Sequence, residues 1–510
     1  MRTSNVCNSL INKGNFAKTK WSLLPIPHGT IPEPKGVDLD FVNVAYSHLI
    51  HSDWEKLEGL ASGLNPFRFK HVLLKIKNDY VLSHEFYKWV KVKQPVLLTL
   101  ETQSMIVHIL TKHQKFQSAG SILRGILSSS SADFDLPMRL FEAILYSYRM
   151  CDSSPGVFDS LFKAHAHLKK LRNATSTFRQ MKDYGFLPTI ESCNALMSSM
   201  HSLKRADIVL SFYREIRKCG ISPNVYTLNM VIAAHCKLTS IEKALEIFHD
   251  MGDMGILPTV ATYNTIISGY CNKGLLTSAV KLKSAMEKNG LKPTEVTFNT
   301  LIHGFCKEGR LQEANKVLSE MRAKEVAPNT ITYNALINGY SQSGNSESGY
   351  ELYEQMQRHG VKTDILTYNA LILAFCKEGK TKKAAYIVKE LDKQNLAPNA
   401  STFSALILGQ CVRKNPERAF QLYRSMIRSG FSPNRCTSER LMFSFCENQD
   451  YDGAVQVLRE MLKSNMSPDS DVLSVLWDGL CQNGNEDLAT LLQNEIKARF
   501  PNCEVSASDQ

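Results

Sequence analysis

Long apolar runs and closely spaced cysteine pairs are both missing from this 510-residue chain. No apolar run approaches the ~18–20 residues of a membrane-spanning helix, so none is predicted. None of the 13 cysteines belongs to a C-x-x-C pair, which removes the main support for a zinc ribbon or a thioredoxin-like site. An odd number of cysteines in so large a chain is also unlike a small disulfide-stapled domain.

Acidic residues are absent from residues 1–32, where Arg2, Lys13, Lys18 and Lys20 lie among many serines, threonines and asparagines. This stretch also lacks the continuous apolar core of ~7–15 residues found in a secretory signal. A basic, hydroxyl-rich start without acids is typical of an organelle transit peptide; the alternative is an ordinary disordered tail. We predict that residues 1–34 form a transit peptide followed by a proline-rich linker.

Catalytic motifs are scarce as well. None of the 14 histidines begins an H-x-E and no P-C-x-x-C occurs, which excludes a zinc nucleotide deaminase. The segment 374–381 resembles a phosphate-binding loop, but it lacks the first glycine and a preceding strand. His165 and His167 are expected on the surface, because no H-E-x-x-H spacing accompanies them. We predict no enzyme activity, metal or cofactor, whereas the net charge of +11 favours an anionic partner.

A period of 35 residues organises most of the chain. Proline recurs in one register, with Thr363 as the one interruption: Pro188, Pro223, Pro258, Pro293, Pro328, Pro398, Pro433 and Pro468. Asparagine, alanine and methionine recur with the same step at other places. We therefore place the starts of successive repeats at 155, 190, 225, 260, 295, 330, 365, 400, 435 and 470.

Each repeat has the pattern of two helices. In 295–329, Phe298, Leu301, Ile302 and Phe305 form one apolar stripe, Gly309 supplies a turn, and a second stripe runs from 311 to 321. One such pair cannot bury its stripe alone, so the repeats must stack into an all-α solenoid of antiparallel helix pairs. We predict degenerate helical repeats or a cap at 35–154, nine repeats at 155–469, and a capping repeat with a tail at 470–510.

Seven cysteines share one place near the end of the first helix, which predicts a buried packing role for them. They are Cys236, Cys271, Cys306, Cys376, Cys411, Cys446 and Cys481, with Ser341 substituting once.

The string VATYNTIISGYCNKGLLTSAVKLKSAMEKNGLKPT at 260–294 strongly resembles a pentatricopeptide repeat of the plant organellar type. Length and the order of Tyr/Phe-Asn, Cys, Gly, Ala, Met, Gly and Pro all match, and uninterrupted units resemble the pure-repeat class of that family. The resemblance implies a right-handed superhelix that binds single-stranded organellar RNA, one base per repeat. The outcome would be RNA stabilisation, processing, splicing or translation. The alternative is a solenoid scaffold for protein–protein interaction.

The resemblance further implies which residues read each base: the residue after the conserved aromatic, paired with the residue after the proline. These pairs are Asn194 with Asn224, Asn229 with Thr259, Asn264 with Thr294, Asn299 with Asn329, Asn334 with Asp364, Asn369 with Asn399, and Ser404 with Asn434. Read parallel to the RNA from 5′ to 3′, they imply a pyrimidine-rich target near Y-Y-Y-C-U-C-A. Two further pairs, Asp159 with Thr189 and Glu439 with Asp469, match no pairing of the family.

Two more rows of residues follow from the resemblance. Tyr226, Ala261, Val296, Ile331 and Leu366 would sandwich the bases, and Lys237, Lys307 and Lys377 would contact phosphates. Asn272, Gln342, Val412 and Glu447 interrupt the lysine row, which predicts modest affinity for the backbone. Family habit favours the mitochondrion, with the chloroplast as the alternative.

Asparagine near a helix start is also a common N-cap, and this is the structural alternative for the asparagine series. Six asparagines in one register, each within an apolar stripe rather than before it, argue against capping.

Overall fold

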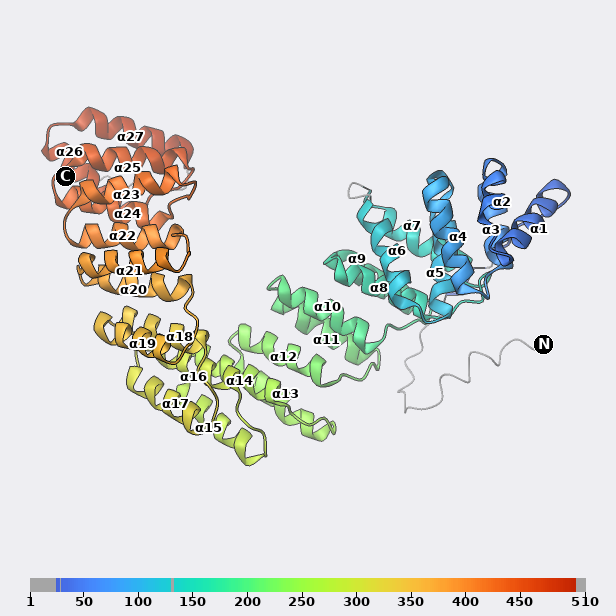
Figure 1. Cartoon of the computed structure of the whole chain (residues 1–510), viewed down its shortest axis with the longest axis horizontal. Coiled ribbons are helices and arrows are strands. Elements are labelled where there is room, and N and C mark those ends of the chain that lie inside the picture. Colours follow the sequence, from blue (N-terminus) through green and yellow to red (C-terminus); the bar gives the residue numbers. More distant parts are fainter. Residues whose placement is uncertain (1–23, 28, 130–132, 501–510) are drawn as a thin grey trace. The chain divides into compact units, whose positions relative to one another are not determined.

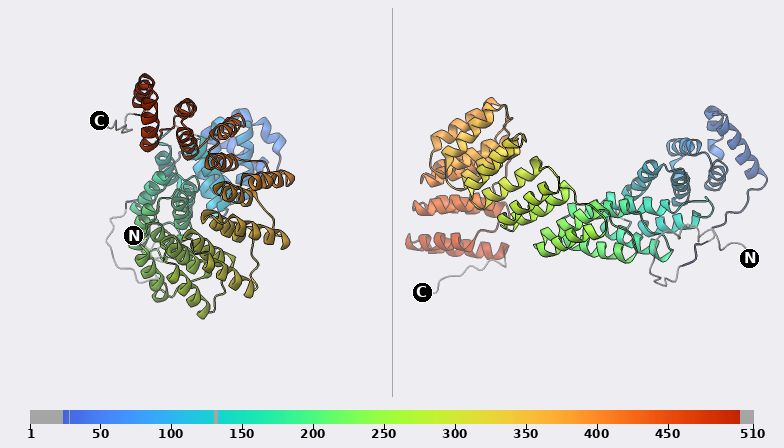
Figure 2. Two further views of the ribbon diagram at one scale, coloured as in Figure 1. Left: turned by 90° about the vertical axis from the view of Figure 1, so that its left-hand side faces the viewer. Right: turned by 90° about the horizontal axis from the view of Figure 1, so that it is seen from below.

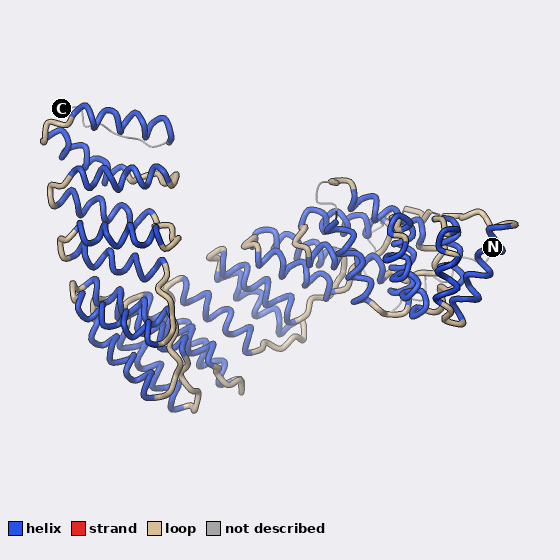
Figure 3. The backbone as a smooth tube through the Cα atoms, turned by 45° about the horizontal axis from the view of Figure 1, so that its top comes forward, coloured by secondary structure: helices blue, strands red, loops and turns tan. Residues whose placement is uncertain are grey.

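The computed structural model describes residues 24–27, 29–129 and 133–500. This part of the chain forms 27 α-helices and two short 3₁₀ helices, and it contains no strand (Figure 3). None of these helices combines the length and apolar character that a membrane span needs. Residues 1–23 and 28 of the predicted transit peptide and linker lie outside the described residues. This assignment and the other predicted domain limits stay predictions.

Helices upstream of residue 155 are irregular in length and spacing (Figure 1). The first begins at Val37, just inside the region predicted as degenerate helical repeats or a cap. The α-helices of this region are α1 (Val37–Ile50), α2 (Trp54–Gly59), α3 (Pro66–Lys75), α4 (Tyr80–Lys93), α5 (Leu100–Lys112), α6 (Phe116–Ser129) and α7 (Leu136–Ser147).

From residue 155 onward the chain is a regular series of helix pairs. The first helices are α8 (Gly156–His167), α10 (Ile190–Ser202), α12 (Val225–Lys237), α14 (Val260–Asn272), α16 (Glu295–Lys307), α18 (Thr330–Gln342), α20 (Ile365–Lys377), α22 (Ala400–Val412), α24 (Arg435–Glu447) and α26 (Ser470–Gln482). The second helices are α9 (Leu171–Asp183), α11 (Ala206–Lys218), α13 (Ile241–Asp253), α15 (Leu276–Lys288), α17 (Leu311–Ala323), α19 (Ser346–Arg358), α21 (Thr381–Lys393), α23 (Pro416–Arg428), α25 (Tyr451–Lys463) and α27 (Glu486–Arg499). The predicted solenoid of antiparallel pairs is confirmed; its superhelical sense stays a prediction.

The chain divides into two compact units, residues 1–266 and 267–510. Within each unit the helices lie side by side in rows, as the views in Figure 2 show. In the second unit α16, α18, α20, α22 and α24 pack against one another in chain order, and each packs against its own second helix.

Local signals set the helix ends. Residues such as Asn329 and Asp364 have extended backbone and accept a hydrogen bond from the third N–H of the following helix, which is N-capping. The second helices end in a left-handed residue that is usually glycine. Glu325, Asn395 and Asn465 adopt the same conformation where glycine is absent.

The core consists of the recurring apolar positions. The alanine that recurs in the second helix is fully buried, as in Ala314, Ala384 and Ala419. The methionine that recurs farther along this helix is also fully buried, as in Met321 and Met356. Because helix pairs bury these side chains only against their neighbours, the stack and the core form together.

A seam of cysteine against glycine sets how closely successive first helices approach. A Cβ atom added to Gly339 would lie 2.8 Å from both Cβ and Sγ of Cys306, and one added to Gly409 would lie 2.6 Å from Sγ of Cys376. Real Cβ atoms essentially never approach so closely, so a side chain at Gly339 or Gly409 would force the cysteine or its helix to shift. The buried packing role predicted for the cysteines is confirmed for five of them: Cys271, Cys306, Cys376, Cys411 and Cys446.

Two sequence-based expectations about single residues are wrong. Cys481 is exposed, because α26 and α27 are the last helices of the described chain and no further repeat covers them. His165 is fully buried rather than on the surface, while His167 two residues later is exposed. Burial lowers the pKa of His165 to about 4, so the ring is neutral at physiological pH.

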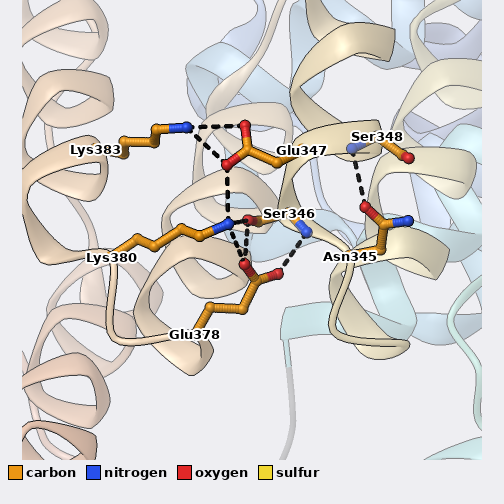
Figure 4. Close-up of polar contacts among 7 residues, drawn as sticks. All are labelled: Asn345, Ser346, Glu347, Ser348, Glu378, Lys380 and Lys383. Atoms are coloured by element: carbon orange, nitrogen blue, oxygen red, sulfur yellow. Dashed lines mark hydrogen bonds and ion pairs between the residues drawn. The ribbon is translucent and has the colours of Figure 1, made fainter.

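Exposed ion pairs also join neighbouring repeats at the turns, as Figure 4 shows. The Glu378 carboxylate accepts from Ser346 N at 2.5 Å and Oγ at 2.6 Å, at the start of α19. The Lys380 ammonium pairs with Glu378 at 2.6 Å and with Glu347 at 2.8 Å. The hydrogen bond from Lys380 lowers the pKa of Glu347. Such solvated pairs contribute little stability, so burial in the seam and core holds the repeats together.

The glycine seam yields a stability prediction. Gly339→Ala should lower the midpoint of urea unfolding, because overpacking costs about 1–3 kcal/mol and outweighs the gain of about 1 kcal/mol in helix propensity.

Gly349→Ala in α19 is the matched control. The nearest atom to its added Cβ lies at 3.8 Å, an ordinary contact, so this variant should be as stable as the wild type or more stable. Equal stabilisation by both substitutions would contradict the proposed role of the seam.

Candidate functional site

The asparagines predicted to read bases lie inside the first helices rather than at their caps. Asn334 is the fifth residue of α18, and Asn369 is the fifth residue of α20. The capping interpretation of this series is therefore wrong. The caps are instead the residues predicted as their partners, Asn224, Asn329, Asp364, Asn399 and Asn434.

The same hydrogen-bonded triad of side chains recurs in several repeats, between the first helix of one repeat and the first helix of the next. Asn334 Nδ2 donates to Asp364 Oδ1 at 2.9 Å, and Thr367 Oγ1 donates to Asn334 Oδ1 at 2.6 Å. Three other repeats have the same bond between the fifth residue and the next cap: Asn194 to Asn224 at 3.1 Å, Asn299 to Asn329 at 3.3 Å, and Asn369 to Asn399 at 3.1 Å. Stacking thus joins three residues that are 30 and 33 positions apart in the sequence.

The charge of Asp364 fixes the orientation of the Asn334 carboxamide. Burial would raise the pKa of Asp364, but hydrogen bonds from Thr367 N and from Asn334 and Thr367 side chains hold this pKa below its usual value. The ionised carboxylate only accepts, so the NH₂ group of Asn334 must face it. The amide then keeps one N–H and one oxygen lone pair free for another molecule.

Not every predicted pair has this geometry. No described residue forms a hydrogen bond with the buried Asn229 Oδ1, and the shorter Thr259 pairs with Thr262 instead. Ser404 Oγ accepts from Thr437 at 3.0 Å, while Asn434 caps α24. Thr294 caps α16 in the same way.

The predicted sandwiching residues form an exposed apolar row at the second position of the first helices. Their exposed fractions are 54% for Tyr226, 60% for Val296, 65% for Ile331 and 63% for Leu366, and Ala261 is exposed as well. Large apolar side chains this exposed are not accounted for by packing within the repeat.

The predicted phosphate-contacting lysines end their helices in solvent. Lys237, Lys307 and Lys377 are all exposed, and within the described part of the chain none of them forms an ion pair with an acidic residue. Their ammonium groups are therefore available to an anion.

A groove of about 1040 Å³ brings eight of the predicted residues of the second unit together, whereas Thr294, Val296, Asn299, Lys307, Asn329 and Asn399 do not line it. It runs along α18, α20, α22 and α24, whose order is visible in Figure 1. Its lining includes Ile331, Asn334, Asp364, Leu366, Asn369, Lys377, Ser404 and Asn434. The residues of repeats 190 and 225 lie in the first unit, outside this groove.

Sequence reasoning missed two features of this surface. The capping role of the second member of each pair was detectable, because a threonine follows it by three places, as in Asp364 and Thr367. Groove-lining residues outside the predicted rows, His303, Asn338 and Arg440, carry no family signal and emerge only from the geometry.

Family models match most of the repeat region. The PPR repeat family model matches 258–307, 293–342 and 328–372, the pentatricopeptide repeat domain model matches 157–202, 211–273 and 351–414, and the PPR repeat model matches 401–431 and 440–466. Together these matches cover more than half of the chain. The chain belongs to the pentatricopeptide repeat family.

Relatives with pentatricopeptide repeats are similar over part of their length. A mitochondrial pentatricopeptide repeat-containing protein of Arabidopsis thaliana is 62% identical over 186 residues, which are 36% of this chain and 35% of that protein. A second Arabidopsis thaliana protein of this family is 28% identical over 32% of this chain and 33% of its own length. The matches thus span about a third of these curated relatives.

Among solved structures, the maize pentatricopeptide repeat protein PPR10 has 17% sequence identity and a TM-score of 0.44, with coverage of 92% of this chain and 80% of that one. PPR10 has also been solved with an 18-nt psaJ RNA element, and that structure has a TM-score of 0.41.

The triad of this pentatricopeptide repeat protein yields a prediction. Thr367→Val keeps the shape of the side chain but removes the hydroxyl that bonds to Asn334 and Asp364, so stability should fall by about 1–2 kcal/mol. The urea-unfolding midpoint measures the change.

Thr300→Val is the control, because Thr300 Oγ1 bonds only to Val296 O of its own helix, at 2.7 Å. Equal midpoints for the two variants would show that the triad adds nothing to the stacking of repeats.

Proposed function

We propose that this protein binds single-stranded RNA sequence-specifically, with one base read by each repeat. The observation that carries the proposal is the recurrent carboxamide, held by the cap and the threonine, beside an exposed apolar residue of the same helix. Base edges need paired donors and acceptors, and base faces need apolar or aromatic surfaces. Rows of both kinds run side by side along the groove, as one strand of RNA would require.

The reading residues proposed for this role are the seven pairs from Asn194–Asn224 to Ser404–Asn434. The Asn334–Asp364 pair is proposed to read U, and the whole series to prefer Y-Y-Y-C-U-C-A. Ile331 and Leu366 would lie on the two faces of that U. The bonds within the pair leave donor and acceptor atoms of Asn334 free, which supports contact with a base edge.

A protein–protein scaffold remains the alternative function for such a solenoid. Binding to a protein does not require the same oriented carboxamide at the same place in successive repeats, whereas reading one base per repeat does. The exposed lysines and the net charge of +11 also favour a polyanion over a protein.

We further propose an organellar location and an organellar transcript as the target. The relative that is 62% identical is a mitochondrial protein, which supports the mitochondrion over the chloroplast. The basic start of the chain without acidic residues agrees with import.

Binding to a pool of short RNAs tests the proposal. Saturable binding enriched for pyrimidine-rich sequences is expected, with affinity that falls only moderately with salt. If three lysines each neutralise one phosphate, log K against log salt should have a slope near ~−2 for a single strand. No binding to any RNA at low salt would overturn the proposal and favour the scaffold.

A substitution tests the proposed code. Asn334→Thr with Asp364 unchanged should move the preference at one position from U to G, because a hydroxyl cannot present the paired donor and acceptor of an amide. A base-edge contact discriminates by ~1–3 kcal/mol, so competition titrations should show a change of about five- to 150-fold.

The neighbouring positions are the internal control, since each repeat contacts only its neighbours. Preferences for the bases at Asn299 and Asn369 should not change. An unaltered preference for U in the Asn334→Thr variant would contradict either the register or the RNA-reading role.

A further inference from the structure

The repeat at 435–469 differs from the two repeats before it at two adjacent positions of its first helix, and the second of these positions, Arg440, lines the groove. Glu439 stands where the preceding repeats have Asn369 and Ser404. Arg440 stands where three preceding repeats place a small side chain, and all four of these residues line the groove: Ala335, Ala370, Ala405 and Arg440.

Glu439 is already engaged by its own repeat. Its Oε1 accepts from Arg435 Nε at 2.6 Å and from the backbone N–H of Asp469 at 2.9 Å. Arg435 also pairs with Asp469 Oδ2 at 3.2 Å, which closes a ring of three charged residues. The Glu439 carboxylate is only 17% exposed and has no proton to donate, so this pair offers a base no donor–acceptor edge.

Arg440 is a cation without a partner at the wall of the groove. It is exposed, and within the described residues it forms no hydrogen bond or ion pair. The groove also places it with Val412, which interrupts the lysine row one repeat after Lys377.

We propose that the repeat 435–469 ends the row of base readers and binds a phosphodiester instead, through Arg440. This inference rests on the proposed RNA binding. The contact lies on the phosphate that joins the nucleotide at Ser404 to the nucleotide facing Glu439. A guanidinium suits this task because its fork of N–H groups matches two phosphate oxygens. Arg440 thereby replaces the cation that the lysine row lacks at Val412.

The main test measures RNA affinity by fluorescence anisotropy for the wild type, Arg440→Ala and the control Arg418→Ala. The control removes an exposed arginine in α23 that does not line the groove. With Arg440 as a fourth cation beside the three lysines, the wild-type salt slope should be ~−3 rather than ~−2. Arg440→Ala should weaken binding about fivefold and reduce the magnitude of this slope by ~0.7. Arg418→Ala should change neither quantity by as much.

An RNA with a neutral methylphosphonate in place of the phosphate between the nucleotides at Ser404 and Glu439 distinguishes a phosphate contact of Arg440 from its other roles. The wild type should lose about fivefold in affinity for this RNA, whereas Arg440→Ala should lose less than about twofold. Equal losses for both proteins would overturn the inference, and so would an Arg440→Ala variant that binds like Arg418→Ala.

The nucleotide facing Glu439 gives the second readout. RNAs with each of the four bases at this position should bind the wild type with affinities that agree within about twofold. Changing the base that faces Asn334 should alter the affinity by more than this. A clear base preference at Glu439 would overturn the inference while leaving the proposed function intact. Failure of the wild type to bind any RNA would overturn both.

Discussion

The burial of apolar stripes between neighbouring helix pairs is the constraint on which the rest of this structure depends. A single pair leaves its stripe in water, so the pairs are stable only as a stack. The contact of Cys306 with Gly339 shows how close that stack is, since even one Cβ atom does not fit between them. At this spacing, residues 30 and 33 positions apart come within hydrogen-bonding distance, as Asn334, Asp364 and Thr367 do.

The stacking of the repeats therefore determines which side chains meet in the candidate site. The buried positions of the first helices hold the stack, and the fifth positions join neighbouring repeats through the triad. The second positions face the groove with large exposed fractions, so their side chains are free to differ between repeats without cost to the core. The repeat at 435–469 shows a change of groove chemistry on the same scaffold, because its two helices pack against each other as in other repeats although Arg440 replaces a small side chain in the groove.

Helix boundaries of the repeats were predictable because one 35-residue period repeats every local signal, from the cap to the left-handed residue at the helix end. The hydrogen-bonding partners of Asn194, Asn299, Asn334 and Asn369 were also predictable. Their capping role was missed because the family resemblance assigned these partners only to base reading. The position of His165 in the sequence could have identified it as buried, because it lies between Ala164 and Ala166 in an apolar helix. Arg440 was not predictable from the family pattern, because its importance depends on the neighbours that the stack brings to it.

A structure of the protein bound to a single-stranded RNA containing Y-Y-Y-C-U-C-A would test the central claim most directly. The account predicts that the U lies between the side chains of Ile331 and Leu366. Its edge would lie within hydrogen-bonding distance, about 3 Å, of the Asn334 carboxamide. RNA bound along the second helices, or bases turned away from the asparagine row, would contradict the account.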